Sequence, residues 1–282
     1  MAEEPPRIEY VEARRVLLDA LDAMRAHLDA VVLVGAQAVY LRTQGRLTGY
    51  QAFTTDADIV LDPAKLGPIP PLGHAMEAAG FTLTDEPGIW EAKFNRPGVD
   101  DEIVVPVDLI VPEQLAPPAG RRAARLPGEH GKTTARKSAG LEGAVVDNSP
   151  IEIVALEDDD TRRVIVNVAG PAALLVAKAH KLGERLATPE RLQAKDAGDV
   201  YRLFDSTSPT DMAAILTTLL TDERSAQMTT AALGYIRRLF ATPTSTGTEL
   251  AAKALRGTLP LPTVVAAITG YTQDLLDRLN ER

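Results

Sequence analysis

The chain has 282 residues and a formal net charge of −9, with hydrophobic residues at 45% and charged residues at 24%. This length suits one large domain or two moderate ones, and the composition is that of a soluble globular protein. The acidic balance argues against a general nucleic-acid coat protein. The absence of any run of 18 apolar residues excludes a membrane span.

The sequence contains no cysteine and four scattered histidines, at positions 27, 74, 130 and 180. A chain without cysteine forms no disulfide, which fits a reducing compartment, and a structural zinc site is not expected. The N-terminus is acidic and proline-rich and lacks the basic-then-apolar order of a secretory signal. We therefore predict a cytoplasmic protein.

The first part of the chain alternates between helical and strand-like patterns. Apolar residues between Val16 and Leu28 recur with helical spacing, which predicts a helix over 9–28. Short helices are predicted at 37–43 and 72–79, and strands at 30–34, 56–61, 89–94, 103–111, 151–156 and 163–168. Pro106 indicates an edge or a bulge in the strand that contains it.

From Pro171 onward the pattern is helical. A proline suits the first position of a helix, where its missing N–H costs nothing. Helices are predicted at 172–186, 195–204, 210–220, 223–240, 250–255 and 263–279. We therefore predict an α+β fold, with an α/β domain over 1–169 and a helical domain over 170–282.

Two acidic residues stand where the second predicted strand begins. Asp56 and Asp58 directly precede the apolar run Ile59 to Leu61, and side chains two apart on a strand project from one face. Their Cα atoms would be about 6–7 Å apart by strand geometry, so the carboxylates repel unless a cation such as Mg²⁺ lies between them. A strand-entry cap is the alternative, and it would be favoured if the pair stood alone.

Two further features favour a metal and phosphate site. A strand, Gly35 and a helix precede the aspartates, so free amides at the start of that helix could hold a phosphate. Asp108 lies in an otherwise apolar strand, where a buried acid needs a partner, and a metal ion shared with Asp56 and Asp58 would be one.

Charged residues also share helix faces in the second half. Lys178, Lys181 and Arg185 lie on one face of the first helix there, and Asp196 and Asp199 share a face of the next. A lysine stripe by itself is usually a solvated surface. Together with the three acids, however, these bases complete the groups that phosphoryl transfer uses.

The stretch 120–140 concentrates positive charge. It contains one acid, Glu129, and six basic residues: Arg121, Arg122, Arg125, Lys132, Arg136 and Lys137. Two interpretations are equal on this evidence, a solvated loop and an arm that contacts phosphates.

The segment from Gly35 to Leu61, with Thr-x-Asp-x-Asp before three apolar residues, resembles the nucleotidyltransferase signature of the DNA polymerase β-like superfamily. The segment "LLVAKAHKLGER…AKDAGDVYRLF" resembles the later motifs of the AbiEii/AbiGii-type toxin branch, which includes MenT-like toxins. There, Lys, Arg and an Asp-x-x-Asp follow in that order. The resemblance extends over residues 31–204 and implies a polymerase β-like domain followed by a helical domain.

The resemblance implies metal-dependent nucleotidyl transfer from a nucleoside triphosphate (NTP). Asp56 and Asp58 would bind Mg²⁺ or Mn²⁺, and Asp108 would complete a second metal site or polarise the acceptor hydroxyl. Asp196 would orient Lys178 or contact the base. Phosphate or nucleotide contacts would come from Gly35, Ala36, Thr54, Lys178, Lys181 and Arg185.

In this branch the acceptor is typically the 3′ end of a tRNA, and a separately encoded antitoxin reverses the resulting growth arrest. The basic stretch around Arg121 to Lys137 would then be an arm that binds the acceptor. Ala36 departs from the family pattern, which usually has Gly or Ser there. A hydroxyl contact to phosphate is lost at that position, although the backbone N–H remains.

Two other functions fit the same residues. An enzyme of this fold could nucleotidylate a small molecule that carries a hydroxyl, such as an antibiotic or a metabolite. A catalytically silent descendant could bind a nucleotide or a partner. A cationic acceptor such as an aminoglycoside would favour an acidic pocket, so the basic stretch favours RNA while the overall acidity keeps a small acceptor open.

Overall fold

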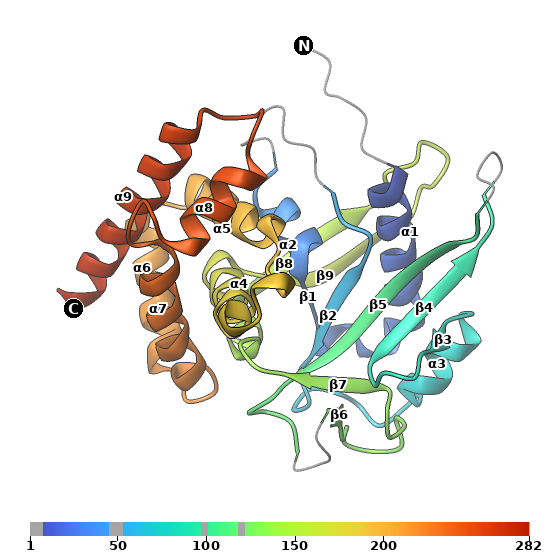
Figure 1. Ribbon diagram of the computed structural model, residues 1–282. Helices are drawn as coiled ribbons and strands as arrows, with labels where there is room; N and C mark the ends of the chain where they lie inside the picture. Colours follow the sequence, from blue (N-terminus) through green and yellow to red (C-terminus); the bar gives the residue numbers. More distant parts are fainter. Residues whose placement is uncertain (1–7, 45–52, 97–100, 118–121, 282) are drawn as a thin grey trace. The chain divides into compact units, whose positions relative to one another are not determined.

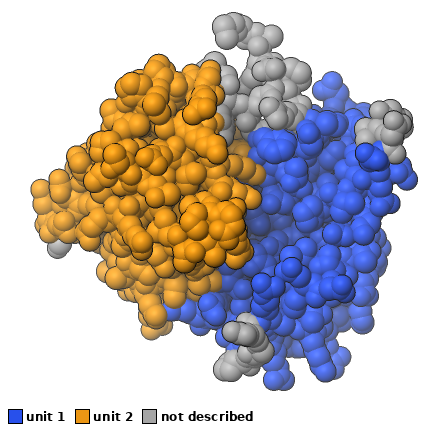
Figure 2. All heavy atoms as spheres, viewed as in Figure 1, with its two compact units in different colours: residues 1–38, 51–138, 148–169 blue, residues 39–50, 139–147, 170–282 orange. Residues whose placement is uncertain are grey.

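The computed structural model describes residues 8–44, 53–96, 101–117 and 122–281 (Figure 1). The chain divides into two compact units, coloured separately in Figure 2. Unit 1 comprises residues 1–38, 51–138 and 148–169, and unit 2 comprises residues 39–50, 139–147 and 170–282. None of the helices in the described ranges has the length and apolar character needed to cross a membrane.

Unit 1 is built around a mixed sheet. The described residues form nine strands, most of them in the order β3-β4-β5-β2-β1-β9-β8, while β6 pairs with β7 and β7 with β5. Pairs β1–β9, β2–β5 and β5–β7 are parallel, whereas pairs such as β1–β2 and β4–β5 are antiparallel. The strands are β1 Val31–Val34, β2 Ala57–Leu61, β3 Thr82–Leu83, β4 Ile89–Phe94, β5 Ile103–Pro112, β6 Ala123–Ala124, β7 Ala135–Ser138, β8 Asn148–Val154 and β9 Arg163–Ala169.

The two central strands β2 and β5 have one apolar face and one face on which acids and apolar residues both occur. Ile59 and Leu61 on β2, with Leu109 on β5, are fully buried on one face. Helix α1 (Ile8–Ala23) packs against β2, β5 and β9, followed by the 3₁₀ turn η1 (Arg25–Ala30), and α3 (Leu72–Ala78) packs against α1. The other face carries Asp58 and Asp108, so alternation along each strand accounts for acids within an apolar sheet.

Pro106 lies inside β5 and yet disturbs no ladder. Within the described residues, β2 pairs with Val107 to Ile110, so the first half of β5 has β4 as its one partner strand there. Pro106, which has no N–H to donate, thus lies where one side of the strand lacks a partner strand. The predicted edge exists for that half of the strand only.

Strands β6 and β7 fall inside the basic stretch 120–140, for which a solvated loop and a phosphate-contacting arm were the two interpretations. Ile110 of β5 pairs in register with Arg136 of β7, and Lys137 follows in the same ladder. Strands of two and four residues are too short to produce a detectable alternation. Arg136 and Lys137 are therefore strand residues, which corrects the loop interpretation for that part.

Unit 2 is helical. Phe204 stacks on Tyr271 in its core, with ring centroids 4.0 Å apart, and Ile236 and Leu239 are fully buried. The helices are α4 Pro171–Glu184, α5 Ala194–Ser206, α6 Pro209–Thr221, α7 Ala226–Phe240, α8 Thr246–Ala254 and α9 Leu261–Asn280, with 3₁₀ turns η2 Glu142–Val145, η3 Arg185–Ala187 and η4 Pro189–Arg191. Each predicted helix of this half corresponds to one of α4 to α9.

The segment 139–147 belongs to unit 2, although the sequence-based division placed it in the first domain. Asp147 explains the difference, because its Oδ2 accepts hydrogen bonds from the backbone N–H groups of Ala172 and Ala173 at 3.1 and 2.9 Å. These are donors that the start of α4 leaves unsatisfied. A cap supplied from 25 residues upstream leaves no local signal in the sequence.

Helix α2 (Gly35–Arg42) begins in unit 1 and ends in unit 2. Near its end, the guanidinium of Arg202 lies 5.0 Å from the ring centroid of Tyr40, a cation–π contact within unit 2. The second half of α2 therefore groups with the helices, and residues 39–50 depart from the predicted division in the same way as 139–147.

Candidate functional site

The side chain of Asp58 packs directly against the backbone of Gly35, at the turn between β1 and α2. Gly35 has φ +71°, a conformation that favours glycine. A Cβ placed on Gly35 would lie 2.0 Å from Oδ2 of Asp58, so only a hydrogen fits between this backbone and the carboxylate. Asp58 pairs with Val34 in the antiparallel β1–β2 ladder, which brings its side chain over the residue that follows β1.

Asp108 lies beside Asp58 on the neighbouring strand. The two residues are register partners in the parallel β2–β5 pair, and adjacent strands run about 4.8 Å apart. Their side chains therefore project from the same face. The structure brings together these two predicted acids without any distortion of the sheet.

Asp56 is held in place just before β2. The hydroxyl of Thr54 donates a hydrogen bond to Asp56 Oδ1, and Gln37 Nε2 donates to the Asp56 carbonyl at 3.1 Å. Gln37 is fixed in turn by the buried Arg14, whose Nε donates to Gln37 Oε1 at 2.9 Å. Thr54 is fully buried, and its hydroxyl orients the carboxylate of Asp56. The phosphate or nucleotide contact that the resemblance implies for Thr54 stays a prediction.

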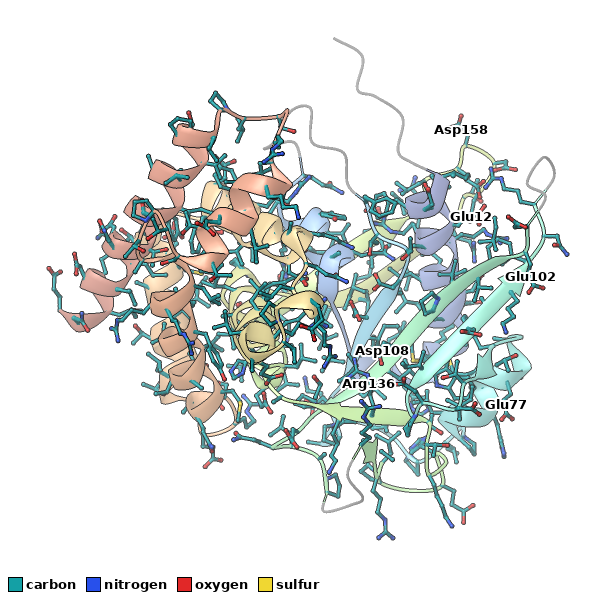
Figure 3. All side chains as sticks on the ribbon, viewed as in Figure 1. Glu12, Glu77, Glu102, Asp108, Arg136 and Asp158 are labelled. Atoms are coloured by element: carbon teal, nitrogen blue, oxygen red, sulfur yellow. The ribbon has the colours of Figure 1, made fainter. Side chains whose placement is uncertain are left out.

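Arg136 is the direct partner of Asp108. Its Nε lies 2.7 and 2.9 Å from the two carboxylate oxygens, and Nη2 also donates to Oδ2. Figure 3 shows the two side chains directed at each other. Burial lowers the pKa of Arg136, but the hydrogen bonds and charge of Asp108, and then the charges of Asp58 and Glu86, raise that pKa overall. The guanidinium is therefore a permanent positive charge within the acidic group.

The carboxylates are better suited to a divalent cation bound by two of them than to one bound by all three. Asp56 and Asp58 supply oxygen donors of the kind that Mg²⁺ prefers. Both oxygens of Asp108 accept hydrogen bonds from the guanidinium of Arg136, which already supplies a positive charge there. Within the described ranges, no three His, Cys, Asp or Glu side chains are grouped so as to hold a metal ion.

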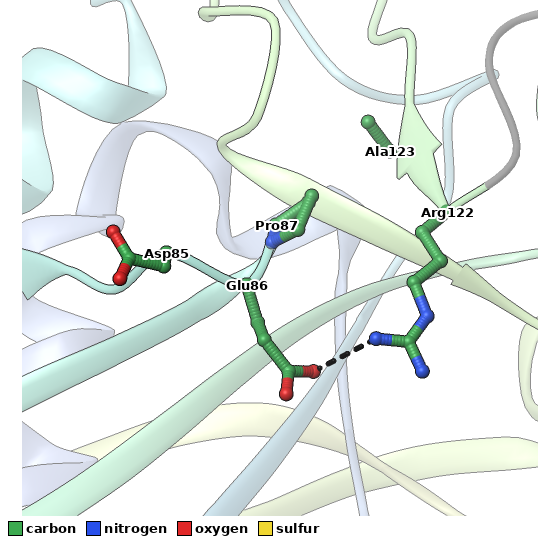
Figure 4. Close-up of a pocket in the computed structure, with 5 residues that line it drawn as sticks. All are labelled: Asp85, Glu86, Pro87, Arg122 and Ala123. Atoms are coloured by element: carbon green, nitrogen blue, oxygen red, sulfur yellow. Dashed lines mark hydrogen bonds and ion pairs between the residues drawn. The ribbon is translucent and has the colours of Figure 1, made fainter.

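A surface pocket of about 770 Å³ lies next to this group, lined by Asp85, Glu86, Pro87, Arg122 and Ala123 (Figure 4). Arg122 Nη1 donates to Glu86 Oε2 at 3.2 Å, with both side chains more than half exposed. Such an exposed pair contributes little to stability. Backbone contacts link the pocket to β7, because Lys137 N donates to the Arg122 carbonyl at 2.8 Å.

The predicted basic arm is divided among several environments. Arg122 is paired with Glu86, Arg136 is committed to Asp108, and Arg125 and Lys132 are exposed. Arg121 lies outside the described residues. The exposed cations of this stretch are thus fewer than its composition implies.

The predicted cationic stripe and its aspartates come together within unit 2. Lys178 is 5% exposed, and its Nζ donates to Asp196 Oδ1 at 2.8 Å and Asp199 Oδ2 at 2.6 Å. Lys181 Nζ lies 3.1 Å and Arg185 Nη1 3.8 Å from carboxylate oxygens of Asp196. Burial opposes charge on Lys178, but both aspartates together raise its pKa. The lysine amine is thus occupied in joining α4 to α5.

Three residues of the acidic site were not identified from the sequence as parts of it: Arg136, Gln37 and Arg14. Arg136 appeared only as one of six bases, and its partner Asp108 lies 28 residues away. The need of Asp108 for a partner was the available signal, but a metal ion satisfies that need as well as an arginine does. Gln37 and Arg14 have no distinguishing pattern.

No family model and no curated protein matches this chain. The crystal structure of JHP933 from Helicobacter pylori is similar with a TM-score of 0.47 and 13% sequence identity, over 98% of this chain and 95% of that chain. At this score and identity, the likeness identifies neither a family nor an activity for this chain.

Proposed function

We propose that the chain is a metal-dependent nucleotidyltransferase of the polymerase β-like kind, which adds nucleotides from an NTP to the 3′ end of tRNA. On this proposal it is the toxin of a toxin–antitoxin pair. The observation that carries the proposal is the position of Asp58 over the glycine that starts α2, with Asp56 two residues before it and Asp108 beside it. This arrangement agrees with the signature from Gly35 to Leu61.

Asp56 and Asp58 would hold one Mg²⁺ or Mn²⁺ ion. The Thr54 hydroxyl and the Gly35 backbone restrict these two carboxylates, so little ordering remains to be done when the ion binds. Bound there, the ion neutralises oxygens of the NTP triphosphate and so favours phosphoryl transfer. Ala36 offers only its backbone N–H toward a phosphate.

Asp108 would polarise the acceptor. In the reaction, the acceptor hydroxyl oxygen would attack the α-phosphorus, a new P–O bond would form and the bond to pyrophosphate would break. The hydroxyl proton would pass to Asp108 and from there to water. Asp108 lies beside Asp58 and would accept the hydrogen bond from the attacking hydroxyl. Burial raises the pKa of Asp108, and the hydrogen bonds and charge of Arg136 oppose that rise. Arg136 would therefore favour the ionised carboxylate and orient it for that role.

A small hydroxyl acceptor is the second candidate, and the pocket beside the acids favours it. Two of the charged residues that line this pocket, Asp85 and Glu86, are acidic, and Arg122 is the basic one (Figure 4). An acidic lining would attract a cationic small molecule such as an aminoglycoside. RNA is favoured instead by the exposed Arg125 and Lys132.

The test is transfer from labelled nucleotides. The purified chain with Mg²⁺ and each of the four NTPs should label tRNA, and parallel reactions with aminoglycosides distinguish the second candidate. Asp56→Asn and Asp58→Asn should lower the rate on the order of 10²-fold or more, because ion stabilisation is worth several kcal/mol. Asp22→Asn is the matched control, since Asp22 at the end of α1 is exposed and, among the described residues, pairs with Arg25 of η1.

Expression in cells completes the test. Inducible expression of the wild type should arrest growth and extend tRNA 3′ ends, as read by end sequencing, whereas Asp56→Asn should do neither. Failure of all four nucleotides to label tRNA would reject the RNA acceptor. Near-wild-type rates in both aspartate variants would reject the site.

A further inference from the structure

Arg136 is held in position by the sheet. It pairs in register with Ile110 of β5 on one side and with Ala123 of β6 on the other. Its backbone N also lies against Gly88, where an added Cβ would come within 2.5 Å of that atom. Because β7 is held on these sides, the side chain of Arg136 extends from a rigid backbone. Its guanidinium is therefore more restricted in position than that of a flexible surface arginine.

The guanidinium gives Asp108 a neighbouring positive charge, as a bound cation would. Nε and Nη2 donate to the two carboxylate oxygens from one direction, as in a bidentate pair. The side chains are 30% and 16% exposed, so the pair is partly shielded from water and screened less than a surface pair. A divalent ion placed at Asp108 would meet this fixed positive charge at close range.

We propose that Arg136 is the resident cation of the acidic site. It balances Asp108 in place of a second divalent ion, so that unit 1 holds a single divalent ion, bound by Asp56 and Asp58. This proposal rests on the proposed function only for the presence of that ion. Arg136 is a positioning residue, which acts through Asp108 and sets how many metal ions the site accepts.

The experiment counts Mn²⁺ ions bound to the full chain, by electron paramagnetic resonance of free Mn²⁺ during titration. The wild type should bind one ion, and Asp56→Asn/Asp58→Asn should bind none. Arg136→Gln should gain a second ion, because it frees both oxygens of Asp108 and removes the repelling charge. Arg122→Gln is the matched control, since it removes a nearby guanidinium that pairs with Glu86 and should leave the count at one.

A double variant guards against a folding defect in Arg136→Gln, which leaves Asp108 without its ion-pair partner. Arg136→Gln/Asp108→Asn removes both charges and should bind one ion again, as the wild type does. Two ions on the wild type would overturn the proposal. So would a count of one on folded Arg136→Gln, or loss of the remaining ion in the double variant.

The count also separates this proposal from the proposed function. A wild type that binds one ion and gains another in Arg136→Gln, yet labels no acceptor, leaves the role of Arg136 intact and rejects nucleotidyl transfer. A wild type that labels tRNA but binds two ions, with Asp108 required for the second, supports nucleotidyl transfer and rejects the role proposed for Arg136.

Discussion

At the scale of single residues, the site depends on the absence of a side chain. Gly35 combines φ +71° with a carboxylate oxygen 2.0 Å from the place where a Cβ would be. Two separate costs therefore oppose any other residue there: backbone strain and a collision with Asp58. Gly80 isolates the first cost, because it has φ +87° and no atom lies within 4 Å of the place that its Cβ would occupy.

Gly35→Ala should destabilise the chain by roughly 2 kcal/mol or more, since strain at positive φ costs about 1–3 kcal/mol before any collision is counted. It should also weaken Mn²⁺ binding at least several-fold, because Asp58 must move. Gly80→Ala should cost only about 1 kcal/mol, from strain alone, and leave Mn²⁺ binding unchanged. Urea unfolding and Mn²⁺ titration of the two variants measure these differences. Equal unfolding energies, or unaltered Mn²⁺ affinity in Gly35→Ala, would show that Asp58 does not depend on this glycine.

At the scale of elements, α4 and α5 are joined by a buried ion pair. Lys178 of α4 donates to Asp196 and Asp199 of α5, and all three side chains are at most 6% exposed. Removal of one partner from such a group leaves uncompensated buried charge, which costs far more than the intact group contributes. The charge on the buried amine of Lys178 is thus needed to balance the charges of Asp196 and Asp199.

Lys178→Met keeps much of the side-chain volume and removes the charge. It should destabilise unit 2 by about 3–5 kcal/mol, because Asp196 and Asp199 lose their shared donor. Lys181→Met removes a second partner of Asp196 but starts from a side chain that is 42% exposed, so it should cost less than about 1 kcal/mol. Thermal and urea unfolding measure both. A similar small cost for the two variants would mean that the buried amine is not needed for stability, which would return Lys178 to consideration as a ligand contact.

The elements themselves were largely predictable from the sequence, and the partners of their charged residues were not. Strands such as β4 and helices such as α4 follow apolar periodicity, which is a local signal. The placement of Asp58 at the start of β2 also followed from a local signal, the apolar run Ile59 to Leu61, whereas Asp56 lies just before the strand. The pairing of Asp108 with Arg136 depends on β7 reaching β5 in parallel register, and a strand of four residues carries too little pattern to reveal this. The cap that Asp147 gives to α4 was missed because it comes from 25 residues upstream of the N–H group of Ala172 that it accepts from.

At the scale of the whole molecule, each unit contains a buried histidine, and the pKa values of these two histidines are shifted in opposite directions. In unit 1, Nδ1 of His130 accepts a hydrogen bond from Leu72 N at 3.0 Å, and His27 lies edge-on at 5.5 Å between ring centroids. Burial, followed by the charge on His27, lowers the pKa of His130, although the Gly67 carbonyl opposes the change. A proton on Nδ1 would also remove the acceptor that Leu72 uses.

In unit 2, both ring nitrogens of His180 face acceptors. Nε2 lies 2.8 Å from the Met228 carbonyl, and Nδ1 lies 3.8 Å from Glu184 Oε1. Burial lowers the pKa of His180, but Glu184, the Met228 carbonyl and the charge of Glu142 together raise it overall. Unit 2 therefore stabilises the protonated ring of His180 relative to the unfolded chain.

The two shifts give opposite dependences of stability on pH around the ordinary histidine pKa of 6.5. For His130 the folded pKa is below the unfolded value, so the unfolded chain binds more protons and unit 1 loses stability as pH falls below 6.5. For His180 the folded pKa is above it, so its contribution is complete below 6.5 and is lost as pH rises through the folded pKa.

Acidification from about pH 7.5 to 5.5, a window that brackets the unperturbed histidine pKa, should therefore weaken unit 1 and strengthen unit 2. Hydrogen exchange, corrected for the intrinsic effect of pH, should show protection falling in β1, β2 and β5 and rising in α4 and α7. The Cε1–H resonances should titrate with midpoints on opposite sides of 6.5, lower for His130 and higher for His180.

His130→Gln should remove the acid-side loss of stability in unit 1 only, and His180→Gln should remove the base-side loss of stability in unit 2 only. Midpoints on the same side, or a common response of both units, would mean that neighbours other than those named here control these rings.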